Sequence, residues 1–466
     1  MRIQFDPINL YAGMVGESHG LTPAELRIAR PEALAALRDF QAAARQDVYG
    51  FPHLPFQKST ATSILDYAEE VRGTYDTVCL VGIGGSALGA WALDCALRGP
   101  HPVQGRFSKK FPRLVILDNV DPTFILDALQ SMDPRKTLVC VAAKSGATAE
   151  TVSAFLIVRD WLENELGAKK ARKRIVAVTS EHRGDLKEMA DSEGYTTFYL
   201  PENVGGRFSV LSAIGMAPAA LIGLDIKKVL AGAAEMTGLC WKKDLKVNHA
   251  LNAALHHYLI LTRRGKSVQV AFPYSNRLWG TAFWFRQLWA ESLGKALDKD
   301  GKQVNAGQTP VAALGTTDQH SQVQLYMEGP NDKVFTFWGV DKFENAGGIP
   351  KVKTGRAAFD YLGGQTLAKL LNAERKATAA ALTAQQRPNC AFTLDRVDEV
   401  HVGAFLQLME FETAFMGQLL NIDAFNQEGV ELGKKFTFGL MGRRGYEEFS
   451  QQYKAYEQKR SKIVVR

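Results

Sequence analysis

Short runs of apolar residues recur along the chain, each separated from the next by a segment long enough for a helix. Five runs lie in the first half: Thr77–Val81, Leu114–Leu117, Thr137–Ala142, Arg174–Val178 and Thr196–Leu200. Apolar runs of this length are typical of strands buried on both faces. Strands that alternate with helices form a parallel sheet with helices on each side. The first half therefore predicts a doubly wound parallel α/β sheet in an α/β/α sandwich.

The same pattern begins again near residue 227. A predicted helix at Val247–Leu261 leads to a strand at Ser267–Phe272 and a helix at Leu278–Lys295, and the runs Val334–Trp338 and Cys390–Leu394 predict further strands. A chain of 466 residues also exceeds the ~250 to 300 residues at which a single core stops growing. We expect an N-terminal extension over residues 1–60 with a helix at Pro31–Gln46, a first domain over 61–226, a second over 227–402 and a C-terminal helical segment over 403–466.

The composition is that of an ordinary soluble globular protein, with 46% hydrophobic and 23% charged residues. The excess of Lys and Arg over Asp and Glu, 56 against 49, is small and spread out, so we expect no nucleic-acid partner. No run of ~18 apolar residues predicts a membrane span, and the first residues lack the pattern of a signal peptide. The five cysteines have no metal-ligand spacing, and Cys79 and Cys140 lie in predicted buried strands. Free buried thiols suit a reducing compartment, so we expect a cytoplasmic protein with no membrane partner and no metal.

A glycine-rich turn, GIGGSALG, follows the first predicted strand and opens a helix near Ser86. Glycines let backbone N–H groups approach a ligand, and the positive end of the helix dipole favours an anion such as a phosphate. The spacing of Gly82, Gly84 and Ala87 also satisfies a permissive dinucleotide fingerprint, with Asp118 after the next strand as a candidate ribose ligand. A purely structural turn is a third interpretation of this stretch.

A second polar loop, KSGATAET, follows the third predicted strand. Lys144, Ser145, Thr148 and Thr151 supply an ammonium group and three hydroxyls next to a glycine. Because the carboxyl ends of parallel strands meet at one edge, the two loops converge where α/β sheets bind ligands. A dinucleotide domain needs only one glycine turn, and small polar residues can simply cap a helix, but the lysine with its hydroxyls favours an anion site.

Residues suited to acid–base chemistry lie farther along the chain. Arg207 follows two glycines ahead of a long apolar helix, a setting that suits stabilisation of a developing negative charge. Gln287 and Glu291 are four residues apart on one predicted helix face. Glu291 has apolar neighbours, and burial of a carboxylate that has neither a partner nor a catalytic role costs free energy. His320 lies in a polar loop that opens a helix. The pattern alone also allows surface roles for Arg207 and Glu291, and it favours one for Lys434 in the final helix.

Taken in order from Thr77 to Lys435, these motifs resemble the phosphoglucose isomerase (glucose-6-phosphate isomerase) family. Two stretches carry most of the resemblance, NVGGRFSVLSAIG at residues 203–215 and FNQEGVELGKK at residues 425–435, and GIGGSALG, KSGATAET, WAESLGK and GTTDQHS also match. The resemblance implies two sugar isomerase (SIS) domains with helical extensions at both ends. It also implies an enzyme that interconverts glucose 6-phosphate and fructose 6-phosphate without a cofactor. The dinucleotide interpretation loses most of its support.

The resemblance further implies which residues bind the substrate and which react. The implied substrate-binding residues are Gly85, Ser86, Lys144, Ser145, Thr148, Gln287 and Gln427, and the implied catalytic residues are Arg207, Glu291, His320 and Lys434. Glu291 would be the base that moves a proton between C1 and C2, and Arg207 would stabilise the enediolate. His320 and Lys434 would assist opening of the sugar ring.

Members of this family are homodimers, and the resemblance implies that His320 enters the active site of the partner subunit. Two departures from the family pattern are Ala143, where a serine is common, and Asn426, where an aspartate is common. Two alternatives stay open from the sequence: an isomerase that also accepts mannose 6-phosphate, and a non-catalytic regulator that binds sugar phosphates. The joint presence of a candidate base, a candidate enediolate cation and two ring-opening residues argues against the regulator.

Overall fold

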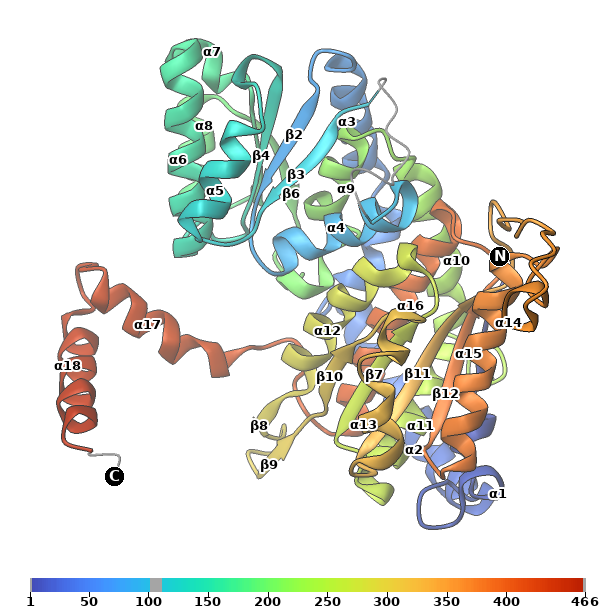
Figure 1. Ribbon diagram of the computed structural model, residues 1–466. Coiled ribbons are helices and arrows are strands. Elements are labelled where there is room, and N and C mark those ends of the chain that lie inside the picture. The colour runs from blue at the N-terminus through green and yellow to red at the C-terminus, as the bar shows by residue number, and fades with distance from the viewer. Residues whose placement is uncertain (1, 101–110, 464–466) are drawn as a thin grey trace.

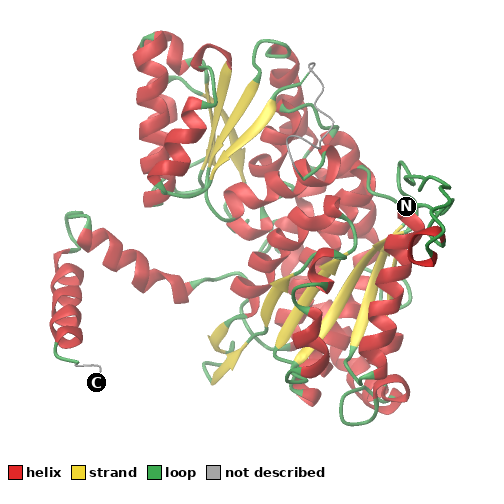
Figure 2. Cartoon of the chain, viewed as in Figure 1, coloured by secondary structure: helices red, strands yellow, loops and turns green. Residues whose placement is uncertain are grey.

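The computed structural model describes residues 2–100 and 111–463; residue 1, residues 101–110 and residues 464–466, which belong to the predicted terminal segments and first domain, lie outside that description. Two sheets, one above the other in Figure 1, are each flanked by helices, and further helices fill the space between them. The secondary-structure colouring of Figure 2 shows the same division into an upper and a lower sheet. The protein is therefore a mixed α/β protein built on two mainly parallel sheets.

The first sheet has the strand order β3-β2-β4-β5-β6, and all its pairs are parallel. Its strands are β2 (Thr77–Val81), β3 (Arg113–Leu117), β4 (Thr137–Ala142), β5 (Ile175–Ser180) and β6 (Thr196–Leu200). They confirm the five strands expected from the apolar runs. The helices that precede, connect and follow them are α3 (Lys58–Glu70), α4 (Gly85–Arg98), α5 (Pro122–Gln130), α6 (Ala149–Leu166), α7 (Ala168–Arg172), α8 (Asp185–Glu193) and α9 (Ala213–Leu221).

The second sheet has the order β1-β12-β11-β7-β10, in which only the β1–β12 pair is antiparallel. Its strands are β1 (Ile3–Asp6), β7 (Val268–Pro273), β10 (Thr309–Ala312), β11 (Lys333–Val340) and β12 (Asn389–Leu394). Sequence analysis predicted β7, β11 and β12 but not the four-residue edge strands β1 and β10, which are too short to give a periodic signal. A two-stranded ribbon, β8 (Lys295–Leu297) and β9 (Gln303–Ala306), stands apart.

The helices of the second half and the N-terminal segment surround this sheet. They are α1 (Ala12–Val15), α2 (Pro23–Arg45), α10 (Ile226–Cys240), α11 (His249–Arg264), α12 (Trp279–Leu293), α13 (Val323–Glu328), α14 (Ala357–Asp360), α15 (Leu367–Ala384) and α16 (Glu399–Leu419). The sequence predicted the N-terminal helix to begin at Pro31, but α2 begins at Pro23. Thr22 and Glu25 form a capping box there, and Pro31 is accommodated inside the helix.

Alternate residues of the buried strands contribute to different cores. In β2, Val78 and Leu80 point into the large core shared by the two halves, whereas Cys79 and Val81 point into a second core on the outer face of the first sheet. In the second sheet, Val270 and Phe272 belong to a third core on its outer face. This period of two is what a strand covered on both faces requires.

Helix α16 lies between the two sheets (Figure 1) and packs against α10, α11 and α12. All but a few of its residues at the two ends are buried, so apolar residues occur on every side of it, with Gln407, Glu410 and Glu412 buried among them. Because α12 rests on this buried helix, the face of α12 that carries Glu291 has a rigid support.

The last two helices, α17 (Glu431–Leu440) and α18 (Glu447–Ser461), pack on each other and extend away from the rest of the chain (Figure 1). Both are largely exposed. Across residues 2–100 and 111–463, no helix combines the length and the apolar character needed to cross a membrane.

Candidate active site

Two loops of the first sheet meet at the point where the strand order reverses. The chain leaves β2 toward β3 on one side and leaves β4 toward β5 on the other, and in α/β sheets ligands bind in the crevice that such a reversal leaves at the carboxyl edge. Helix α4 begins in the first loop at Gly85, and Thr148 is the N-cap residue of α6 in the second. The positive ends of two helix dipoles therefore face this crevice, as an anion site requires.

Glycines bring the first loop against two other parts of the chain. Gly84 has a positive φ of 57°, and a Cβ there would lie 2.8 Å from Nε2 of Gln287. A Cβ on Gly85 would lie closer than 3.0 Å to the carbonyl group of Gly206 and to the backbone nitrogen of Arg207. The start of α4, the Gly205–Arg207 turn and α12 are thus in direct contact only because these positions lack side chains.

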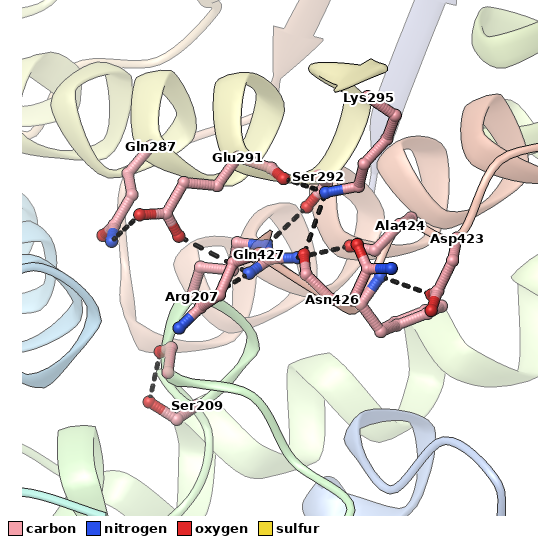
Figure 3. A network of polar contacts seen from close by, with 12 residues as sticks. Arg207, Ser209, Gln287, Glu291, Ser292, Lys295, Asp423, Ala424, Asn426 and Gln427 are labelled. Carbon is pink, nitrogen blue, oxygen red and sulfur yellow. Dashed lines mark hydrogen bonds and ion pairs between the residues drawn. The ribbon is translucent and has the colours of Figure 1, made fainter. Parts of the chain in front are cut away.

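Arg207 is the centre of a network of polar contacts (Figure 3). Its side chain is 1% exposed, and its Nε donates to Oγ of Ser292 at 2.8 Å. Nη1 donates to Oε1 of Gln427 at 2.9 Å and lies 3.5 Å from Oε2 of Glu291. Nη2 donates to the carbonyl oxygens of Ala424 at 2.5 Å and Asn426 at 2.9 Å.

Burial lowers the pKa of the Arg207 guanidinium, and the nearby carboxylates of Glu291 and Asp423 oppose that shift. An arginine stays protonated under these conditions because its ordinary pKa is so high. Its contacts fix the orientation of the planar group, with Nη1 toward Glu291. The protein therefore holds a fixed positive charge beside a partly exposed carboxylate.

Glu291 and Gln287 lie one turn apart on α12, and Nε2 of Gln287 donates to Oε1 of Glu291 at 3.4 Å. The Glu291 side chain is 31% exposed, so a ligand can reach it. One carboxylate oxygen faces the amide and the other faces Arg207. Among residues 2–100 and 111–463, no three His, Cys, Asp or Glu side chains gather in a way that could hold a metal ion.

An aromatic cluster from distant segments supports the Arg207 turn. Phe208 packs against Phe51 and Phe425, with ring centroids 5.0 and 4.9 Å apart, and Tyr49 stacks on Phe425 at 4.1 Å. The N-terminal segment, in which the sequence showed no catalytic signature, thus supplies packing under the site. Its rings pack on the side chains of Phe208, next to Arg207, and of Phe425, two residues before Gln427.

The second polar loop is hydrogen-bonded to the segment that leads into Arg207. The Lys144 ammonium donates to the carbonyl oxygens of Glu202 and, at 3.1 Å, Val204, and burial lowers its pKa. It therefore ties the loop after β4 to the segment that leads into Arg207. Ser145 is exposed and its Oγ accepts from the backbone N–H of Ala147, while Ala143 is 6% exposed and belongs to the outer core of the first sheet.

His320 and Lys434 are not joined to the Arg207 network by a hydrogen bond or ion pair within the described part of the chain. His320 is exposed at the end of a short 3₁₀ turn whose neighbours are anchored, since Gln319 donates to the Tyr274 hydroxyl at 2.8 Å and Asp318 accepts from the N–H of Leu314 at 2.7 Å. Lys434 lies on the projecting helix α17 and pairs with Glu431 at 2.7 Å.

Sequence reasoning missed Ser292 and Lys295 and the backbone carbonyls of the 423–427 segment. Lys295 donates to the carbonyl oxygens of Glu291 at 2.6 Å and Asn426 at 2.8 Å. Both residues lie in the WAESLGK motif, which was the available signal. Asn426 takes part through its carbonyl oxygen, so these contacts are indifferent to whether the side chain is an amide or a carboxylate.

Comparison with known proteins gives consistent results. A sequence model of phosphoglucose isomerase matches residues 66–448. The glucose-6-phosphate isomerase of Carboxydothermus hydrogenoformans is 42% identical over 90% of each chain, and that of Rubrobacter xylanophilus is 41% identical over 94% of this chain and 98% of its own. A solved structure of a protein from Thermus thermophilus superposes with a TM-score of 0.84 at 36% identity, over 95% of this chain and 100% of that one.

A glucose-6-phosphate isomerase from Chlamydia trachomatis also superposes, with a TM-score of 0.74 at 25% identity, over 86% of this chain and 77% of its own. The family match extends through the parallel strands of both sheets and through each loop that meets at Arg207. The agreement of sequence, fold and site therefore means that the chain belongs to the phosphoglucose isomerase family.

Proposed function

We propose that this protein is a glucose-6-phosphate isomerase, which interconverts glucose 6-phosphate and fructose 6-phosphate through a cis-enediolate. The observation that carries the proposal is the Glu291–Arg207 pair, a partly exposed carboxylate 3.5 Å from a buried and fixed guanidinium. Moving a hydrogen between carbons next to a carbonyl needs a base for the C–H bond and a cation for the resulting oxyanion. Curated relatives of this family are named for that reaction.

In the aldose-to-ketose direction, Glu291 removes the proton from C2 of the open-chain sugar. The C–H electron pair forms the C1–C2 double bond, and the carbonyl electrons move onto O1. Arg207 faces the charge that develops, and because its contacts are already made, little reorganisation is needed when the charge appears. Glu291 then returns its proton to C1, and a proton passes from O2 to O1, which leaves the carbonyl at C2.

The substrate phosphate is proposed to lie in the crevice between the loops after β2 and β4. The backbone and hydroxyl groups of Gly85, Ser86, Ser145 and Thr148 would contact it, and the two helix N-termini would favour its charge. Lys144 contributes to the positive field and holds the second loop in place. Gln287 and Gln427, which flank the Glu291–Arg207 pair, would position the sugar hydroxyls.

We further propose that the enzyme works as a homodimer in the cytoplasm, where it serves glycolysis and gluconeogenesis. His320 would enter the partner's site and, with Lys434, assist ring opening. The exposure of His320 and its separation from the Arg207 network of its own chain support this assignment. All five cysteines are free and buried, which supports a reducing compartment.

The direct test is a coupled assay for conversion of fructose 6-phosphate to glucose 6-phosphate, with no cofactor or metal added to the isomerisation step. We expect turnover that is abolished in the Glu291→Gln variant. Wild-type protein that is folded but shows no conversion above background would refute the proposed activity.

The arrangement in trans is tested with mixed dimers of Glu291→Gln and His320→Ala chains. If His320 acts in the partner's site, each mixed dimer contains one site with both lesions and one intact site, so about a quarter of wild-type activity returns after random pairing. If both residues came from one chain, every site would carry a lesion. Absence of recovery in dimers whose mixing is confirmed by mass would place His320 in its own subunit's site.

A further inference from the structure

Lys295 joins the helix that carries Glu291 to the segment that holds Arg207. Its Nζ donates to the carbonyl oxygen of Glu291 at 2.6 Å and to that of Asn426 at 2.8 Å, as Figure 3 shows. The first contact alone would be ordinary, because the last carbonyls of a helix lack helical partners and a lysine near the end often binds them. The second contact is not explained by capping.

The carbonyl of Asn426 is shared. It accepts from Nη2 of Arg207 at 2.9 Å as well as from Lys295. One oxygen therefore connects the guanidinium, the 423–427 segment and, through Lys295, the backbone of the candidate base. A change in the position of Lys295 would shift Glu291 relative to Arg207, and catalysis is sensitive to displacements of about 1 Å between such groups.

Two cations thus donate to the same carbonyl oxygen, the buried Arg207 and the half-buried Lys295. The charged groups that act on Lys295 are Arg207, Asp423, Glu291 and Glu428. Burial, followed by repulsion from Arg207, lowers the pKa of the Lys295 ammonium to about 8. Lys295 donates its hydrogen bonds to neutral carbonyl oxygens, so its positive charge is not neutralised by a direct ion pair with a carboxylate.

We propose that Lys295 is a positioning residue for the isomerase reaction, which fixes the Glu291 backbone against the Asn426 carbonyl and so sets the alignment of the base with Arg207. This inference rests on the proposed function. Lys295 does not touch the substrate in it, and its effect appears in turnover because alignment matters most when the proton moves.

The experiment compares Lys295→Met with Lys299→Met in the full-length enzyme. Lys299 is a matched control because its Nζ also makes a hydrogen bond, to Gln418 at 2.8 Å, but outside the Arg207 network. We expect Lys295→Met to lower kcat roughly 10-fold while KM changes less than about twofold, whereas Lys299→Met retains wild-type kinetics. Thermal melting of both variants separates this effect from loss of folded protein.

The pH profile supplies a second readout. Wild-type kcat should fall as the pH rises through about 8, where Lys295 loses its charge, and this part of the profile should be absent from Lys295→Met. Lys295→Gln, which keeps a donor without the charge, replaces the methionine variant if that protein does not fold, and the same criteria apply. An active wild type with an unchanged kcat and pH profile in the variant overturns the positioning role alone, whereas an inactive wild type overturns the proposed function.

Discussion

The two sheets share the order of four of their five strands but place different residues at the candidate site. In the first sheet β2 lies between β3 and β4, and in the second β7 lies between β10 and β11. In each sheet, leaving β1 aside, the second strand along the chain therefore lies on one side of the first strand and the third strand lies on the other side. The helices that follow these first strands, α4 and α12, pack against each other at the middle of the molecule. The two halves are thus related in topology, and equivalent helices meet at the site.

The difference lies in the segment between the first strand of each sheet and its helix. After β2 the chain turns through glycines and exposes the N-terminus of α4, whereas after β7 a 3₁₀ turn (Asn276–Leu278) leads into α12, which presents Gln287 and Glu291 from its last turns. In the proposed function, the loops of the first half after β2 and β4 bind the phosphate with backbone and hydroxyl groups. The second half supplies the base, and Arg207 of the first half faces it, so binding and proton transfer are assigned to different loops of one repeated topology.

The largest loss of activity is expected for replacement of Glu291, which lies in the second half. Glu291→Gln removes the base but keeps the shape, so kcat should fall by ~10² to 10⁴ while substrate still binds. Exchange of the C2 hydrogen with solvent should be lost in parallel and can be followed by NMR. Exchange that persists in the variant would assign the base to another residue.

Replacement of Arg207 should cause the second largest loss of activity. Arg207→Lys keeps a charge but cannot reproduce the contacts to Ser292, Gln427 and two carbonyl oxygens, so we expect kcat to fall roughly 10²-fold, comparable to loss of an oxyanion donor. KM should change less. A variant that alters KM alone would assign Arg207 to ground-state binding, and melting curves should accompany the kinetics because the side chain is buried.

Gly85 tests the contact between the start of α4 and the Arg207 turn. In Gly85→Ala the new methyl group would collide with the Gly206 carbonyl, so the Arg207 turn must shift and kcat/KM should fall roughly 10- to 100-fold. Gly205→Ala is the matched control, because a Cβ there has no neighbour within 4 Å and φ is −75°. Equal activities for the two variants would show that the close approach is dispensable.

The smallest effects are expected in the two candidate phosphate-binding loops, after β2 and β4. Ser86→Ala and Thr148→Ala each remove one candidate hydrogen bond to the phosphate, so KM should rise roughly 10-fold with little change in kcat. Steady-state kinetics with both sugar phosphates measure this directly. A fall in kcat at constant KM would contradict the assignment of these two hydroxyls to substrate binding.

Sequence reasoning predicted most of the parallel strands and the residues of α12, because buried strands and helices leave periodic apolar patterns. It could not predict that Lys144 would bind the carbonyls of Glu202 and Val204, since backbone acceptors leave no mark in a sequence. The contact between Arg207 and Gln427 joins residues 220 positions apart. Only the resemblance to a family linked them, and it did so without naming Lys295.

Strand β1 has a consequence for handling the protein. Residues Ile3–Asp6 cover the outer edge of β12, with Phe5 opposite Phe392. Without them, β12 would present unpaired N–H and C=O groups beside an apolar sequence, which is a template for association with other chains. Truncations or tags that disturb the first six residues should therefore promote aggregation, which light scattering can measure. An affinity tag fused beyond the projecting α18 should leave β1 paired with β12 and should not have this effect.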